Sequence, residues 1–339
     1  MESYVSGLEL SRRLFVEIVG PALADDHPNL DYSAALLGRG SEVLGYDDAQ
    51  SADHDRQPRV LIFLRDGEPV DPVAATVRRA VPERFDGFPT DHRVQPLRGY
   101  VHGQLGVDQD HQPTVRDWLS LSEQRLLMFT AGEVFHDGAG LQPVRDRYAY
   151  YPRDVWLYLL STAWWRVHPE ANLVGRTGQV GDELGSALIG ADLVRGLMQL
   201  CFLIERRYAP YPKWFGTAFA RLPGAATLQP LLRSVLAAEH WREREEALIA
   251  AYREVAARQN ALALTEPVPT ELVQLWDRPF RVLWGDFPAA LQAEIRDPEV
   301  LDLVRRWPAG GLDRVRDVLP GRPDLDGLTG GVKAPGPTG

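Results

Sequence analysis

The sequence predicts an α+β chain in which a small mixed sheet comes first and helices follow. Apolar runs of strand length alternate with helical patterns over the first 145 residues, whereas the patterns from residue 141 onward are helical. Clusters of Gly, Pro and Asp separate these segments. With 339 residues, of which 45% are hydrophobic, the chain is long enough to form two modest domains.

The segments of the first part can be placed one by one. Apolar residues at helical spacing predict an opening helix over residues 7–18, ended by Gly20-Pro21. Further along the chain, the patterns predict strands at 34–37, 59–64, 92–97 and 133–135, with a helix that begins at Pro72 and another over 113–132. This strand-helix-strand order indicates a mixed sheet with helices packed against it.

The second part shows only helical patterns, over residues 182–208, 231–264 and, as a helical pair, 270–307. The glycine-rich segment 175–181 lacks the Gly-Lys-Ser/Thr ending of a P-loop, and we expect it to be a loop between helices. We therefore predict a sheet domain over 1–145, a helical domain over 146–320, and a disordered Pro/Gly-rich tail over 321–339.

Composition limits the classes of function. We find no 18-residue apolar stretch and no basic-then-apolar N-terminus, so neither a membrane span nor a signal peptide is expected. The single cysteine, Cys201, fits a reducing cytoplasm, and the abundance of Ala, Leu and Arg is typical of a GC-rich bacterial genome. The net charge of −10 disfavours a nucleic-acid partner.

One stretch carries most of the chemical information. Gly40 and Ser41 form a small turn, and Asp53 and Asp55 follow just before the strand over 59–64. Such a turn lets backbone N–H groups approach a phosphate, while carboxylates on alternate residues of an extended segment share one face and can bind divalent ions. The alternative is an ordinary acidic loop, but carboxylates beside a buried strand need a cation to neutralise them.

The block from Gly40 to Arg59 resembles the signature of the nucleotidyltransferase superfamily, which includes aminoglycoside nucleotidyltransferases and polymerase-β-like enzymes. It is most similar to an uncharacterised bacterial family of that fold, and the resemblance extends over about residues 5–300. The resemblance implies a small mixed-sheet nucleotidyltransferase domain followed by an all-helical domain.

The resemblance also implies an activity: an acceptor oxygen attacks the α-phosphate of a nucleoside triphosphate, and pyrophosphate leaves. Gly40 and Ser41 would hold the phosphates, and Asp53 and Asp55 would ligate Mg²⁺ or Mn²⁺ and act in catalysis. We expect transfer of AMP from ATP to a hydroxyl of a small-molecule acceptor. A protein or RNA acceptor, as in toxin-type members of the superfamily, is a further alternative.

The chain departs from the superfamily pattern at the third catalytic carboxylate, where we expect Gln95. An amide can contact a metal through its carbonyl oxygen, but it cannot take a proton. Asp91 could substitute if the register of the strand differs. A catalytically degenerate protein that binds or senses nucleotides is therefore the alternative to an enzyme.

Other polar residues are weaker candidates. Arg207 and Lys213 lie in a segment that resembles part of the same family and could bind the triphosphate, or they could simply stabilise a helix C-terminus. Glu183, Asp192 and Arg195 could line an acceptor site or form a solvated helix face. Glu133 is a further candidate, whereas we interpret Asp137 as a turn residue.

Overall fold

A computed structural model describes residues 4–48, 57–168, 170–274, 277–307 and 310–311 of the chain. The chain folds into two compact units. The first contains Met1–Pro113 and Glu123–Ala149, and the second contains Thr114–Ser122 and Tyr150–Gly339. The chain therefore enters the second unit briefly before it completes the first, which the single expected boundary at residue 145 did not anticipate. The tail over 321–339 lies outside the described residues.

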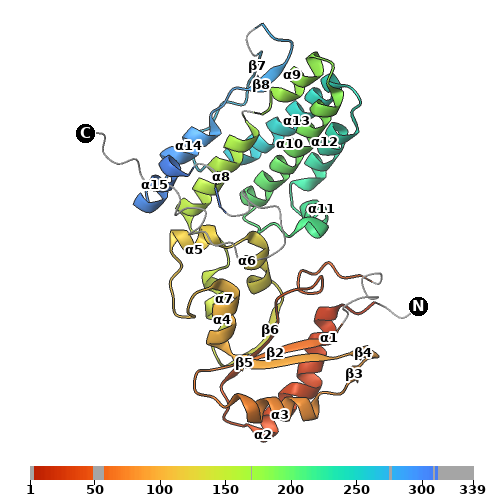
Figure 1. Ribbon diagram of the computed structural model, residues 1–339, viewed down its shortest axis with the longest axis vertical. Coiled ribbons are helices and arrows are strands. Elements are labelled where there is room, and N and C mark those ends of the chain that lie inside the picture. The colour runs from red at the N-terminus through yellow and green to blue at the C-terminus, as the bar shows by residue number, and fades with distance from the viewer. Residues whose placement is uncertain (1–3, 49–56, 169, 275–276, 308–309, 312–339) are drawn as a thin grey trace. The chain divides into compact units, whose positions relative to one another are not determined.

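The first unit is built around a four-stranded sheet with the order β5-β2-β1-β6 (Figure 1). The strands are β1 Tyr32–Leu36, β2 Arg59–Leu64, β5 Asp91–Pro96 and β6 Glu133–Asp137. β1 pairs with β2 and β6 in antiparallel orientation, and β2 pairs with β5 in parallel orientation. The predicted small mixed sheet is thus confirmed. A separate short hairpin of β3 Arg84–Phe85 and β4 Phe88–Pro89 was not predicted.

Helices cover both faces of this sheet (Figure 1). One face carries α1 Gly7–Leu14, the π-helical segment η1 Phe15–Val19, α2 Gly20–Asp26 and α3 Val70–Ala80. The other carries α4 Leu97–Leu105, α6 Glu123–Thr130 and α7 Leu141–Arg147. Because side chains alternate along β2, Val60 and Ile62 enter the core under the first group of helices, while Phe63 packs on Tyr100 of α4, with ring centroids 4.6 Å apart.

The opening helix is longer than expected. The sequence predicts its end at Gly20-Pro21, but α2 continues from η1 through to Asp26. Pro21 occupies the first turn of α2, where its missing N–H group costs little hydrogen bonding. The predicted end was wrong because the helix passes through the wider π-helical segment η1, in which the Gly20 N–H group bonds to the Phe15 carbonyl oxygen, just before Pro21.

The second unit is mainly helical. Its helices are α5 Val115–Ser120, α8 Arg153–Val167, α9 Leu173–Gln179, α10 Glu183–Ile204, α11 Pro212–Ala220, α12 Ala225–Ala237, α13 Trp241–Ala261, α14 Phe287–Ala293 and α15 Pro298–Arg306. A two-stranded ladder of β7 Leu272–Gln274 and β8 Arg281–Leu283 is added to them. The prediction of an α+β chain is confirmed, although the second part is not purely helical as expected.

Three predicted segments differ in detail from the structure. The helix expected over 113–132 is two helices, separated where Leu121 turns extended. The helix expected over 231–264 breaks at Ala238, and His240 then caps α13 by accepting a hydrogen bond from the Arg242 N–H group. The loop expected at 175–181 is largely helix α9. In each case tertiary packing or capping outweighs the local pattern.

The long helix α10 is strongly apolar. By length and composition it could cross a membrane, contrary to the expectation of no such segment, and 56% of its most apolar window is buried inside the protein. Its cysteine, Cys201, is buried, and burial raises the pKa of the thiol to about 12. Within the second unit, α10 packs on α8, α9, α12 and α13.

Candidate functional site

The strand register brings four strand ends together at one end of the sheet. Arg59 begins β2 opposite Asp91, which begins β5, and Leu36 ends β1 opposite Glu133, which begins β6. Because β1 runs antiparallel to β2, the chain that leaves β1 toward Gly40 and Ser41 emerges at this same end. We call it the turn end of the sheet, and we call residues 37–46 the turn.

The Arg59 guanidinium fastens the turn to the sheet. Its Nη2 donates to the carbonyl oxygens of Leu37, at 3.1 Å, and of Arg39, at 2.7 Å. The same atom lies 3.2 Å from the Glu42 carboxylate. Both side chains are largely shielded, with 21% of Arg59 and 13% of Glu42 exposed. Hydrogen bonds between charged partners in such a setting are stronger than those on an open surface.

Gly40 has a backbone conformation that suits only glycine. Its φ angle is +131°, and a Cβ atom placed on it would lie 2.1 Å from a carboxylate oxygen of Glu42. The Glu42 side chain thus folds back over Gly40 and occupies the space that a side chain at residue 40 would need. Ser41 continues the turn, and its carbonyl oxygen accepts a hydrogen bond from the Tyr46 N–H group at 2.9 Å.

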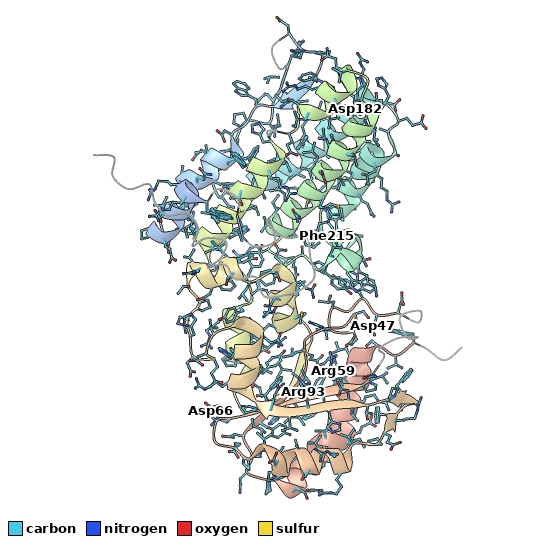
Figure 2. All side chains as sticks on the ribbon, viewed as in Figure 1. Asp47, Arg59, Asp66, Arg93, Asp182 and Phe215 are labelled. Atoms are coloured by element: carbon cyan, nitrogen blue, oxygen red, sulfur yellow. The ribbon has the colours of Figure 1, made fainter. Side chains whose placement is uncertain are left out.

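The end of the turn is held by the first helix. The Asp47 carboxylate accepts hydrogen bonds from the Tyr4 hydroxyl and the Gly7 N–H group, each at 2.7 Å. Ser11 of α1 accepts a hydrogen bond from the Arg59 N–H group at 3.0 Å. Figure 2 labels Asp47 on the segment that follows the turn and Arg59 at the start of β2. The turn is therefore tied at both ends, to β2 and to the N-terminus of α1.

Glu133 is occupied by an ion pair at the same end of the sheet. Its carboxylate accepts hydrogen bonds from Nε of Arg12, at 2.8 Å, and from the second arm of that guanidinium. These bonds hold the pKa of the Glu133 carboxyl below its ordinary value of 4.5. Glu133 thus links β6 to α1. Asp137 accepts hydrogen bonds from the N–H groups of Leu141 and Gln142 at the start of α7, consistent with a turn residue.

The register separates Gln95 from the turn end. Gln95 pairs with Phe63, four positions beyond the row of Arg59 and Asp91, which is about 13 Å along the strand. Asp91, which is exposed, stands in the first row, and its N–H group bonds to the carbonyl oxygen of Pro58. Asp91 and Gln95 share one face of β5, because they are an even number of residues apart.

The two carboxylates expected to bind metal, Asp53 and Asp55, lie outside the described residues. They precede β2 directly, so the chain passes from them into the turn end at Pro58 and Arg59. Within the described ranges, no group of three or more His, Cys, Asp or Glu side chains is arranged to hold a metal ion. The expected metal role of Asp53 and Asp55 stays a prediction.

Arg207 and Lys213 flank the C-terminal end of α10 in the second unit. Both are exposed, and the Lys213 ammonium lies 4.8 Å from the centroid of the Trp214 ring. The neighbouring Arg206 has a φ angle of +52°, and its guanidinium stacks over the rings of Tyr150 and Trp156. The helix end is thus bordered by cationic and aromatic side chains, and a role in nucleotide binding stays a prediction.

Glu183 lies at the other end of α10, roughly 30 Å along the helix axis from Arg207. Its carboxylate is 3.3 Å from the guanidinium of Arg244, a residue with only 2% of its surface exposed. Asp192 and Arg195 are exposed on the same helix. Glu183 therefore partners a buried charge far from Arg207, and an acceptor-side role for Glu183, Asp192 and Arg195 stays a prediction.

Sequence reasoning assigned no role to Arg59 or Glu42. One signal was present, because an arginine that opens an apolar strand places a charge at the edge of the core, where it needs partners. The identity of those partners could not be predicted, since two of them are carbonyl oxygens of the turn.

Residues 118–215 match a family model described as a domain of unknown function, DUF4037. The matched stretch is less than half of the chain and contains none of Gly40, Ser41, Asp53 and Asp55. Among curated proteins, the comparison found no match.

Solved structures that match include the crystal structure of a nucleotidyltransferase-like protein from Exiguobacterium sibiricum 255-15. It has 12% sequence identity and a TM-score of 0.33, and the match covers 87% of this chain and 91% of that chain. A likeness at this level assigns no residue role to the present chain.

Proposed function

We propose that this protein is a magnesium-dependent nucleotidyltransferase that transfers a nucleoside monophosphate, AMP from ATP, to a hydroxyl group of a small-molecule acceptor. In this proposal the turn at Gly40 and Ser41 receives the phosphates, and Asp53 and Asp55 hold Mg²⁺ or Mn²⁺. The metal would stabilise negative charge on the phosphates, while the protein residues orient the triphosphate.

The observation that carries the proposal is the shared position of the two sequence motifs. The Gly40–Ser41 turn leaves β1 at the turn end, and β2 begins at that same end. Asp55 precedes Arg59, the first residue of β2, by four positions in the sequence, and this short separation supports a shared site in the proposal.

The direct experiment measures pyrophosphate release from each nucleoside triphosphate in the presence of Mg²⁺ and pooled hydroxyl acceptors. We expect release from the wild-type protein and none from the variant Asp53→Asn/Asp55→Asn, because neutral amides bind magnesium poorly. If the wild-type protein releases pyrophosphate from none of the triphosphates, this result would count against the proposal.

A second candidate is a protein that binds a nucleotide without turning it over. The register favours it in one respect, because Gln95 is neutral and lies four rows from the turn end. If Asp91 supplies the third carboxylate instead, Asp91→Asn should stop pyrophosphate release, whereas Gln95→Ala should leave most of it. Calorimetric binding of ATP without any consumption would support the second candidate over the first.

A further inference from the structure

We propose that Arg59 is the positioning residue of the phosphate-binding turn and that Glu42 is its charge partner. The inference rests on the proposed function, since it explains how the turn is kept in a shape and a charge state that an anion can enter. Arg59 has this role through the turn, and we assign it no contact with the substrate.

The contacts of Arg59 with the turn carry the inference. A single guanidinium nitrogen contacts three points of the turn, the carbonyl oxygens of Leu37 and Arg39 and the carboxylate of Glu42. These points bracket Gly40, whose positive φ angle departs from ordinary extended or helical backbone. The bonds to Leu37 and Arg39 hold the backbone that precedes Gly40, and the contact with Glu42 holds the side chain that folds over it.

The charge of Arg59 also matters to the turn. The Glu42 carboxylate folds over Gly40 and is only 13% exposed, so water screens its charge poorly. A carboxylate here repels a phosphate bound at Gly40 and Ser41. The Arg59 guanidinium lies 3.2 Å away, and its positive charge offsets that repulsion. The ion pair therefore lowers the electrostatic cost of binding an anion at the turn.

The test uses four variants of the full-length chain and the affinity for ATP with Mg²⁺, measured by calorimetry. Arg59→Gln should weaken ATP binding on the order of tenfold or more, because it removes a positive charge next to Glu42 and breaks the bonds to the turn. Glu42→Gln in addition should recover part of the loss, since the repulsion disappears. Arg59→Lys keeps the charge but not the reach and planar shape of the guanidinium, and should lose less affinity than Arg59→Gln.

The matched control is Arg65→Gln. Arg65 follows the other end of β2 and makes the same kinds of contact, with the Asp31 carboxylate at 2.8 Å and the Gly138 carbonyl oxygen at 2.9 Å. Because these contacts lie away from the turn end, ATP affinity should be unchanged. Equal losses in Arg59→Gln and Arg65→Gln, or wild-type affinity in Arg59→Gln, would overturn the inference.

Amide hydrogen exchange of residues 40–45 gives a readout that does not depend on nucleotide binding. Exchange should be faster in Arg59→Gln and in Arg59→Lys than in the wild type, and unchanged in Arg65→Gln. If the wild-type protein binds no ATP, the proposed function fails, and exchange alone then decides the role of Arg59. Faster exchange supports the positioning role, and unchanged exchange refutes it.

Discussion

At the scale of single residues, Gly40 gives the sharpest test of the turn geometry. Gly40→Ala should lower the free energy of unfolding by about 1–3 kcal/mol, because alanine is strained at the observed φ angle and its Cβ atom meets Glu42. Urea denaturation measures the loss. Gly99→Ala is the control, since Gly99 lies in α4 with open space around it, and this change should be neutral or stabilising by up to about 1 kcal/mol. Equal stability of both variants would contradict the described turn.

The ion pair of Arg12 and Glu133 predicts a defined pH dependence. Arg12 lowers the pKa of Glu133 in the folded state, so the stabilisation is present above pH 4.5 and is lost as the pH falls through the lowered value. Both side chains are more than a third exposed, so the effect should stay below about 1 kcal/mol. Wild type and Glu133→Gln, unfolded in urea at several pH values, should differ near pH 7 and converge in acid. A constant difference would argue against the pair.

Single residues also mark the limit of sequence reasoning at the site. Gly40 and Ser41 could be singled out because a turn that approaches phosphate needs small residues, a requirement visible in the sequence itself. Gln95 and Asp91 could not be distinguished, because the choice depends on which residue of β5 stands beside Arg59. Arg59 and Glu42 were missed because their partners are parts of the backbone of the turn or each other.

At the scale of elements, the buried strand was predicted with its full bounds, 59–64, because a short apolar run bordered by turn residues has few alternatives. The long helices were predicted as helices, but the positions where they break, such as Leu121 and Ala238, were not. The prediction of a loop over 175–181 was wrong for a different reason, because two glycines of this segment allow helix α9 to pack closely against other side chains. A Cβ atom on Gly178 would lie 2.1 Å from Trp241, and one on Gly175 would lie 2.8 Å from Phe280.

The pairing of α10 with α13 yields an element-scale prediction. Arg244 of α13 is buried and contacts Glu183, Ser186 and the Ala238 carbonyl oxygen. Glu183→Ala should therefore lower the free energy of unfolding by about 1–2 kcal/mol, a value reduced by the partial exposure of Glu183. Thermal unfolding is the measurement.

Asp192→Ala is the matched control for that prediction, because Asp192 is an exposed carboxylate on the same helix. Its removal should change stability by less than about 0.5 kcal/mol. If Glu183→Ala instead left stability unchanged and only reduced turnover, Glu183 would act at an acceptor site, as the sequence first suggested.

At the scale of the whole molecule, helix α5 belongs to the second unit although it precedes the last segment of the first unit in the sequence. We therefore predict that the stability of the second unit depends on α5. Trp118 of α5 is buried, and its ring lies 5.6 Å from that of Tyr151. Trp118→Ala in the full chain should cost about 3–5 kcal/mol in stability. A fragment that begins at residue 150 lacks α5 and should melt at a lower temperature than the full chain.

The Trp118→Ala change and the removal of residues 1–149 both take away the packing of Trp118. Both should therefore lower the melting temperature of the second unit in calorimetry. A fragment from residue 150 that melts as sharply and at as high a temperature as the second unit of the full chain would contradict the assignment of α5.

The domain order itself was predictable, because strand patterns end before residue 141. The early excursion of α5 was not, since amphipathic periodicity does not say which core a helix joins.

The central claim is that one end of the sheet binds a metal-complexed triphosphate. Calorimetric titration of ATP into the wild-type protein and into Asp53→Asn/Asp55→Asn, each with and without Mg²⁺, tests it most directly. We predict saturable, Mg²⁺-dependent binding to the wild type that the double variant loses. Absence of binding to the wild type, or equal binding by both proteins, would contradict the claim.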